Sequence, residues 1–424
     1  METFRRLSRI IAHYELLFYL LLLPLALFPS PARLPVLLLI PLLWLANKIG
    51  NGRFFPSTPL NTSLTLLAFM ILVSMYATFD MAFSLGKIIG LWYGIGLFFA
   101  VTSFTAVSVQ RQRWGIAAFL LIGTAINTVS LLGMTRSHKF PLLTPLIARL
   151  PAQAQWLPGI ESAINSNQAA GVLLWLTPLA LALMVAGVME LRRRRSAIPL
   201  LLAITGIAGF LTAVLILTQS RSGLLGLIIG IGAMVAILLR RQWRWLLLIT
   251  GIGLLAAGLL WWQMGDEITA VITTQARVDL NNPISTIDGR LEIWSRAIYG
   301  LQDFPFTGMG MNNFRRVVHI LYPLFLVSPD TDIAHAHNQW LQAGLDLGIP
   351  GLIAYVAIWL GVAAMLLKTW QHNHDIWRRA AVIGFVGAMV ASLIYGMTDT
   401  VALGAKPGFL WWIMLGLISG SFSN

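Results

Sequence analysis

Polar segments that interrupt long apolar runs carry the side chains able to bind an anion or to move a proton. The first reads Gln219-Ser220-Arg221-Ser222-Gly223. Arginine presents planar, bidentate donors, and the N–H groups of a helix that begins at Ser222 would point at the same anion. The segment predicts an anion site centred on Arg221, with Gln219 and Ser222 in support. The alternative is a reverse turn whose arginine reaches lipid head groups.

A second arginine and two histidines follow downstream. Arg290 lies in Asp288-Gly289-Arg290-Leu291-Glu292 and is a second candidate for binding an anion. The alternative is that it is a solvent-exposed residue or pairs with a neighbour on its own helix. His335 and His337 precede Asn338, and an imidazole with a reference pKa near 6.5 is suited to take a proton near neutral pH. Alternate histidines could also ligate a metal, but the sequence offers no convincing third and fourth ligands. We therefore expect neither a metal nor another cofactor.

Lys87 is a further candidate, because it lies at the outer end of a long apolar run. An ionisable group at such depth is costly and is a functional-site hypothesis by default, with snorkelling to the interface as the equal competitor.

The composition indicates a membrane protein. Among 424 residues, 57% are hydrophobic and 11% are charged, and the mean hydropathy is +0.77. These values exclude an ordinary water-soluble domain. The net charge of +13 comes mostly from short clusters between apolar runs, which is typical of membrane topology and not of nucleic-acid binding. The absence of cysteine excludes disulfides and thiol catalysis.

The hydropathy pattern predicts an all-α polytopic membrane protein with about twelve transmembrane helices. The expected spans lie near residues 14–30, 34–47, 62–79, 85–107, 114–134, 167–189, 198–218, 222–239, 245–262, 345–367, 380–397 and 403–420. Basic clusters fall at alternate connections, so the positive-inside rule places both termini in the cytoplasm. The first helix is expected to be retained, because no cleavage site follows it.

This topology predicts three regions: transmembrane helices 1–9 in residues 1–262, a large, mostly helical periplasmic loop in residues 263–344, and transmembrane helices 10–12 in residues 345–424. Within the loop, Thr286-Ile287-Asp288 predicts a helix start and Phe304-Pro305 its end. An apolar stripe at helical spacing runs between them, over Leu291, Ile293, Trp294, Ala297, Ile298 and Leu301. A second long outer connection, residues 135–165, receives no role. Because the candidate residues gather beside the outer face, we expect the site there.

The order of these motifs resembles the O-antigen ligase family, which belongs to a superfamily of ligases, polymerases and O-oligosaccharyltransferases. The resemblance rests on Ser-Arg-Ser-Gly at a helix junction, then G-R-x-x-x-W, then P-x-x-G-x-G-x-x-x-F, then H-x-H-N before a span opening G-x-x-G. These are Ser220 to Gly223; Gly289, Arg290 and Trp294; Pro305, Gly308, Gly310 and Phe314; and His335, His337, Asn338, Gly348 and Gly351. Asp346 departs from the pattern, because relatives often place glutamate before the glycine, and it receives no role.

The resemblance implies a fold similar to membrane-type C glycosyltransferases in a bacterial inner membrane. It also implies an undecaprenyl-pyrophosphate-linked glycan donor and a lipid A-core sugar hydroxyl as acceptor. Our own hypothesis is that a metal-independent, inverting displacement joins them. We hypothesise that Arg221, Arg290 and Lys87 bind the pyrophosphate and that His337 is the general base, with His335 and Asn338 orienting the site.

Two other functions remain open. An O-antigen polymerase or a protein O-oligosaccharyltransferase would use the same kind of donor. A transporter of an anionic lipid or a small anion belongs to another class, but such proteins place paired broken helices of repeated halves at mid-membrane, and this sequence has no matching halves.

Overall fold

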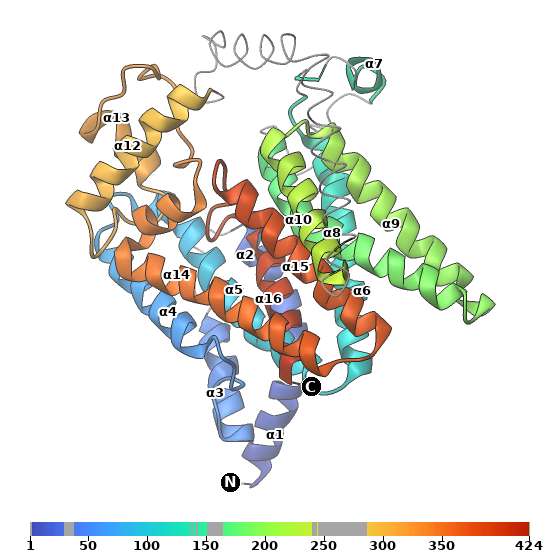
Figure 1. Ribbon diagram of the computed structural model, residues 1–424. Helices are drawn as coiled ribbons and strands as arrows, with labels where there is room; N and C mark the ends of the chain where they lie inside the picture. Colours follow the sequence, from blue (N-terminus) through green and yellow to red (C-terminus); the bar gives the residue numbers. More distant parts are fainter. Residues whose placement is uncertain are drawn as a thin grey trace.

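The computed structural model describes residues 2–28, 38–136, 139–140, 143–150, 164–239, 244 and 286–423, and these form a helical bundle with a smaller helical body at its upper end (Figure 1). Among these residues the β-structure is a single isolated bridge between Met134 and Ile164. The predicted all-α class is confirmed.

Seven helices in the described part of the chain are long and apolar enough to cross a membrane. They are α5 (Met81–Thr105), α6 (Val109–Gly133), α8 (Ser166–Leu191), α9 (Ile198–Leu217, preceded by the 3₁₀ turn η3, Arg195–Ala197), α10 (Arg221–Leu239), α14 (Gln339–His372) and α15 (Ile376–Gly396). Helices α1 (Glu2–His13) and α2 (Glu15–Leu27) meet at 60° and make an eighth if they form one broken span.

Three of the expected spans coincide with shorter helices: α3 (Leu39–Asn51), α4 (Asn61–Tyr76) and α16 (Phe409–Ser423). At 1.5 Å per residue, helices of 13 to 16 residues reach about 20–24 Å, which is less than the roughly 30 Å of a hydrocarbon core. The expected span at residues 245–262 lies outside the described residues. The count of about twelve spans therefore stays a prediction.

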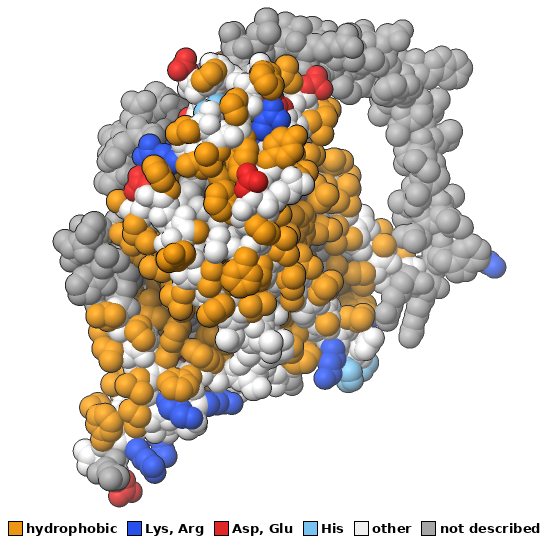
Figure 2. Space-filling view, turned by 90° about the vertical axis from the view of Figure 1, so that its left-hand side faces the viewer, with side chains coloured by type: hydrophobic (Ala, Val, Ile, Leu, Met, Phe, Trp, Pro, Cys, Tyr) orange, Lys and Arg blue, Asp and Glu red, His pale blue; other side chains and the backbone are white. Residues whose placement is uncertain are grey.

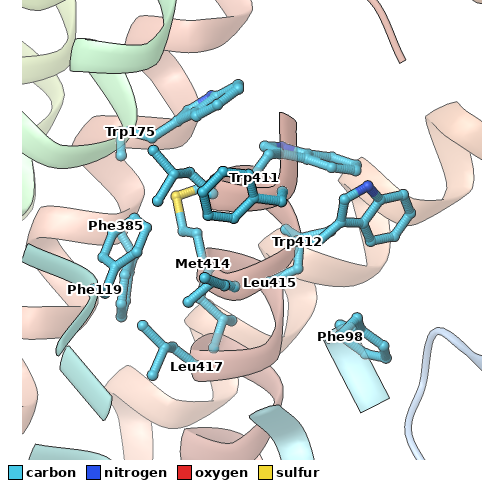
Figure 3. Close-up of a cluster of buried hydrophobic side chains, with 14 of the residues drawn as sticks. Phe98, Phe119, Trp175, Phe385, Trp411, Trp412, Met414, Leu415 and Leu417 are labelled. Carbon is cyan, nitrogen blue, oxygen red and sulfur yellow. The ribbon is translucent and has the colours of Figure 1, made fainter. Parts of the chain in front are cut away.

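Helix α16 is short and lies in the centre of the bundle. It is apolar on all sides and nearly every residue is buried, as expected of a helix surrounded by other helices. Figure 3 shows side chains from α5, α6, α8 and α15 converging on it. The labelled residues of this core are Phe98, Phe119, Trp175, Phe385, Trp411, Trp412, Met414, Leu415 and Leu417.

The two ends of the bundle differ in charge. Both chain ends lie at the lower end in Figure 1, and α12 (Ile287–Asp303) and α13 (Phe314–Leu321) lie at the upper end. At the lower end, Arg113 is 3.5 Å from Asp375, and the Lys368 ammonium lies 5.0 Å from the Phe422 ring centroid. Figure 2 shows a broad hydrophobic belt above Lys and Arg side chains at the lower end of the molecule. This arrangement fits the positive-inside pattern, while the identity of the membrane face stays a prediction.

The predicted limits of α12 are confirmed. The Thr286 hydroxyl accepts a hydrogen bond from the Gly289 N–H at 3.1 Å, and the helix ends at Asp303, before Phe304-Pro305. The predicted apolar stripe is wrong in part, because Leu291 and Ile298 are 52% and 46% exposed. The buried face carries Ile293 and Ala297, which join a separate small core with α13.

The glycine motifs hold this upper body to the bundle. The turn after α12 contains Gly308 at φ 66°, and α14 is kinked at Gly348, where φ is 72° and ψ is 177°. The Met309 N–H donates to the Leu345 carbonyl and the Ile349 N–H donates to the Pro305 carbonyl, each at 2.7 Å. Turn and kink therefore interlock backbone to backbone, and the position of α12 is fixed relative to α14.

We predict that Gly348→Ala lowers the free energy of unfolding by at least about 2 kcal/mol, because a backbone at this φ and ψ is restricted to glycine. A Cβ there would also overlap the Phe306 carbonyl. Thermal unfolding of purified protein in detergent measures the loss. Gly206→Ala in α9 is the control, since a Cβ there meets nothing within 4 Å. Equal melting temperatures for the two variants would contradict the interlock.

Candidate active site

The segment His335–Asn338, called the histidine segment below, is held at its end by the loop that joins α15 to α16. Asn338 caps α14, its Oδ1 accepting from the Trp340 and Leu341 N–H groups at 3.0 and 3.1 Å. Its Nδ2 donates to the Met397 carbonyl at 3.1 Å. The Asn338 side chain thus caps the helix that follows the histidines and also holds the loop after α15. Asn338, predicted as a supporting residue, therefore has a positioning role.

This contact brings Asp399, which sequence reasoning missed, to both histidines. Its side chain is 3% exposed, and its Oδ1 lies 3.4 Å from His337 Nδ1 and 3.8 Å from His335 Nε2. The Thr400 N–H also donates to Oδ1 at 2.9 Å. His337 itself has φ 49°, a conformation uncommon for a residue with a side chain and typical of functional segments.

Hydrogen bonding assigns the tautomer of His335. The His337 N–H donates to His335 Nδ1 at 3.2 Å, so a neutral His335 ring carries its proton on Nε2, toward Asp399. Burial lowers the pKa of His335 to about 3, with the charges of His337, Lys87 and Arg290 acting in the same direction and Asp399 opposing them. His335 is therefore neutral at physiological pH and is suited to hold the site, not to accept a proton.

Asp399 is ionised within the protein. Burial raises the pKa of its carboxyl, but the hydrogen bond and charge of His337, together with the charges of His335 and Arg290, outweigh it and hold the pKa below its usual range. His337 Nδ1 lies 3.4 Å from Asp399 Oδ1, and among the described residues neither this nitrogen nor Asp399 Oδ2 has a hydrogen-bond partner of standard geometry. If His337 directs its Nδ1–H at the carboxylate, the neutral ring keeps Nε2 as its accepting nitrogen.

Two of the predicted cations belong to this cluster. Arg290 lies in the first turn of α12 and acts electrostatically on Asp399 and His335. Lys87, from α5, acts on His335 and on the buried Asp346. The structure thus brings together four residues singled out from the sequence, at the end of the bundle that faces α12.

Asp346, which received no role from the sequence, connects the upper body to the histidines. Its Oδ1 accepts from the Asn312 N–H at 3.0 Å and from Gln342 Nε2 at 2.9 Å. Gln342 Oε1 in turn accepts from the Ala336 N–H, between the histidines, at 2.8 Å. This chain of buried hydrogen bonds fixes the histidine segment from behind.

The third predicted cation, Arg221, reaches this end of the bundle from another pair of helices. Arg221 is exposed at the start of α10, which packs against α15 with Gly226 beside Ala391 and Gly230 beside Gly387. This antiparallel packing places Arg221 near the end of α15 that leads to Asp399. The Gly223 N–H donates to Ser220 Oγ at 3.3 Å, so one of the N–H groups expected to face an anion is already satisfied.

The two supporting residues of this segment have local contacts. Gln219 is fully buried, and its Oε1 accepts from the Phe140 N–H at 2.7 Å, which ties the α9–α10 turn to the connection that precedes α8. The Ser222 hydroxyl lies 3.4 Å from Ser220 Oγ. Both contacts shape the turn that presents Arg221.

In the structure, Asp399 is a possible third metal ligand beside His335 and His337. Possible ligand atoms of His335, His337 and Asp399 all lie within 4.8 Å of one another. Two features oppose a cation there: His335 Nδ1 is used and its Nε2 carries the proton, and the positive charges of Lys87 and Arg290 act on the same cluster.

One signal could have found Asp399 in the sequence. It lies just beyond the apolar run of residues 380–397, and an acid at the outer end of a span deserves the same attention as Lys87. Its pairing with His337 could not be read, because 62 positions separate the two in the sequence (399 − 337).

We predict that His335 makes the protein less stable in mild acid. Between about pH 6.5 and pH 3 the unfolded chain binds a proton that the folded ring does not, so stability falls as the pH drops through this window. From pH 7.5 to pH 5.0, wild-type protein should lose about 2 kcal/mol more than His335→Gln in thermal unfolding. The exposed His374, changed to Gln, should keep the wild-type slope; equal slopes for all three proteins would refute the assignment.

Comparison with known families agrees with the motifs. Residues 206–356 match the sequence profile of a family described as O-antigen ligase, a region that includes Arg221, Arg290 and His337 and leaves out Lys87 and Asp399. A search of curated proteins found no match. Members of this family are glycosyltransferase-like ligases and polymerases that act in general on lipid-linked glycans and lipid acceptors. The apolar helices are those of a membrane protein, and residues 206–356 of this chain are similar to the O-antigen ligase family.

Proposed function

We propose that this protein is an O-antigen ligase. It transfers a glycan from an undecaprenyl-pyrophosphate carrier to a sugar hydroxyl of the lipid A-core oligosaccharide, at the periplasmic face of a bacterial inner membrane. Both termini are cytoplasmic in this proposal, which is consistent with the Lys and Arg side chains at the end of the bundle opposite α12 (Figure 2).

One observation carries the proposal: the His337 imidazole lies 3.4 Å from the buried Asp399 carboxylate. The positive charges of Arg290 and Lys87 act on the same cluster of residues. A carboxylate behind Nδ1 stabilises the imidazolium that forms when Nε2 takes a proton. Fixed cations stabilise the charge that develops on a leaving group. The cluster thus combines a general base with cations for the leaving group, and glycan transfer from a pyrophosphate requires both.

The reaction follows from these roles. His337 Nε2 takes the proton of the acceptor hydroxyl while that oxygen forms a bond to the anomeric carbon. The bond from this carbon to the phosphate oxygen breaks, and its electron pair leaves with undecaprenyl pyrophosphate. Arg290, Lys87 and Arg221 neutralise the departing anion, so no metal is needed. Attack from the face opposite the leaving group inverts the anomeric centre.

The deciding experiment mixes purified full-length protein with lipid-linked glycan and candidate acceptors, with and without a chelator. Glycosylated lipid A-core, formed equally with EDTA, supports the proposal. Lengthened carrier-linked glycan would instead indicate an O-antigen polymerase, glycosylated protein an O-oligosaccharyltransferase, and retained stereochemistry a different mechanism. Flux of an anionic lipid or small anion into proteoliposomes without covalent product would indicate a transporter.

We predict that His337→Ala lowers the transfer rate by about two to four powers of ten, because the acceptor proton then has no positioned base. Asp399→Asn should also slow transfer, since the amide removes the charge that faces His337. Initial rates of product formation measure both effects, and the melting temperature tests folding. His374→Ala, an exposed histidine at the opposite end, is the matched control. A His337→Ala variant with near-normal rate would eliminate this residue as the base.

We predict that Arg290→Lys weakens donor use by about tenfold or more, because a point charge cannot replace a bidentate guanidinium. The ratio kcat/KM for the lipid-linked donor measures the loss, while the KM for the acceptor should stay close to wild type. Arg195→Lys, exposed at the other end of the bundle, is the control. Unchanged donor kinetics in Arg290→Lys would show that Arg290 does not contact the pyrophosphate.

A further inference from the structure

A cavity of about 690 Å³, including its open mouth, lies beside the candidate active site and is not explained by the reaction chemistry. Its walls come from the end of α2, the first turns of α5, and the segment that contains the short 3₁₀ turn η5 (Lys406–Gly408). Its polar lining includes Lys87, Lys406 and Asn312, and its apolar lining includes Ala26, Leu27 and Phe409.

Two ammonium groups line this cavity without an acidic partner in contact. Within the described residues, neither the Lys87 nor the Lys406 side chain has a hydrogen bond or an ion pair shorter than 4 Å. The Lys406 ammonium lies over the Phe28 ring at 4.5 Å, and Lys87 interacts electrostatically with the buried Asp346. Two cations beside low-dielectric walls attract an anion strongly.

The backbone holds the two lysines in fixed relation. Gly404, at φ 74°, packs so closely on α5 that a Cβ would overlap the Lys87 carbonyl, and a Cβ on Gly90 would overlap the Gly404 carbonyl. The loop that carries Asp399 thus continues directly into the cavity wall. Lys87 belongs to both places, since it lines the cavity and acts on His335.

The chemistry of the lining indicates one class of ligand. A free inorganic anion would gain nothing from Ala26, Leu27 and Phe409, and a purely apolar chain would leave two ammonium groups unpaired. A phosphorylated headgroup attached to a hydrocarbon chain satisfies both parts of the wall.

We propose that Lys406, together with Lys87, binds the phosphate groups of a lipid headgroup in this cavity, with the start of the lipid chain against Ala26, Leu27 and Phe409. The inference rests on the proposed function, in which one substrate is a lipid pyrophosphate. Phosphorylated lipid A could supply the same chemistry, and the experiment separates the two sources.

The test measures binding, not transfer, so that its failure is distinguishable from failure of the proposed function. Full-length protein in nanodiscs is titrated with undecaprenyl pyrophosphate without glycan, with phosphorylated lipid A-core, and with inorganic pyrophosphate. We compare wild type, Lys406→Gln, Lys406→Arg and Lys368→Gln. Lys368 is the matched control, because it also lies over a phenylalanine ring but at the opposite end of the bundle.

We expect Lys406→Gln to lower the affinity for one lipid about tenfold, Lys406→Arg to restore most of it, and Lys368→Gln to leave it unchanged. Loss confined to undecaprenyl pyrophosphate identifies the donor carrier as occupant, and loss confined to lipid A-core identifies the acceptor. Either result stands even if no glycan is transferred. Wild-type affinity of Lys406→Gln for both lipids, or an equal loss in Lys368→Gln, would overturn the proposal.

A second measurement avoids dependence on the folding of the variant. Wild-type protein is treated with an amine-acylating reagent with and without saturating lipid, and modification of Lys406 is quantified by peptide mass spectrometry. Lipid should protect Lys406 at least about fivefold while Lys368 is modified equally in both samples. Equal modification of Lys406 with and without each lipid would contradict its position in the binding site.

Discussion

The site depends on one buried carboxylate that remains charged. Asp399 is 3% exposed, and the cost of removing an ionised group from water is several kcal/mol unless nearby groups compensate. Its compensation comes from three parts of the chain: the histidine segment, Arg290 of α12, and the Thr400 N–H. Any rearrangement that separates these parts leaves the carboxylate without partners. The same charge that is suited to orient His337 therefore also holds the upper body, the α14 entry and the α15–α16 loop together.

The glycine and proline motifs support this arrangement without taking part in chemistry. The turn at Gly308 and the kink at Gly348 exchange two backbone hydrogen bonds, which fixes α12 and hence Arg290. Asp346 extends the same connection through Gln342 to the backbone between the histidines. The glycine and proline motifs of the family resemblance thus position the reactive residues. A substitution in these motifs should lower the stability of the protein more than it lowers the rate of the reaction.

Local patterns predicted much of this structure, and contacts between distant segments account for the rest. Hydropathy located α5, α6 and α8 to within a few residues, and the Thr286 cap and Phe304-Pro305 limited α12. Hydropathy could not show that α16 is short and central, because a buried helix and a lipid-facing one have similar composition. Periodicity also cannot show which distant residues pair: Asp399 and His337 come from segments far apart in the sequence, which the hydrogen bond from Asn338 to Met397 joins.

In the proposed reaction, the position of Lys87 links lipid binding to the group that accepts the proton. Its ammonium lines the cavity with Lys406, and its charge lowers the pKa of His335, the residue that receives the His337 N–H. An anion bound beside Lys87 offsets part of that positive charge, so the electrostatic cost of protonating the nearby imidazoles falls when the lipid is present. In the proposed reaction His337 must become positive as the sugar bond forms. Binding of the phosphorylated headgroup and acceptance of the proton should therefore favour each other, and the cation shared by the two sites provides the coupling.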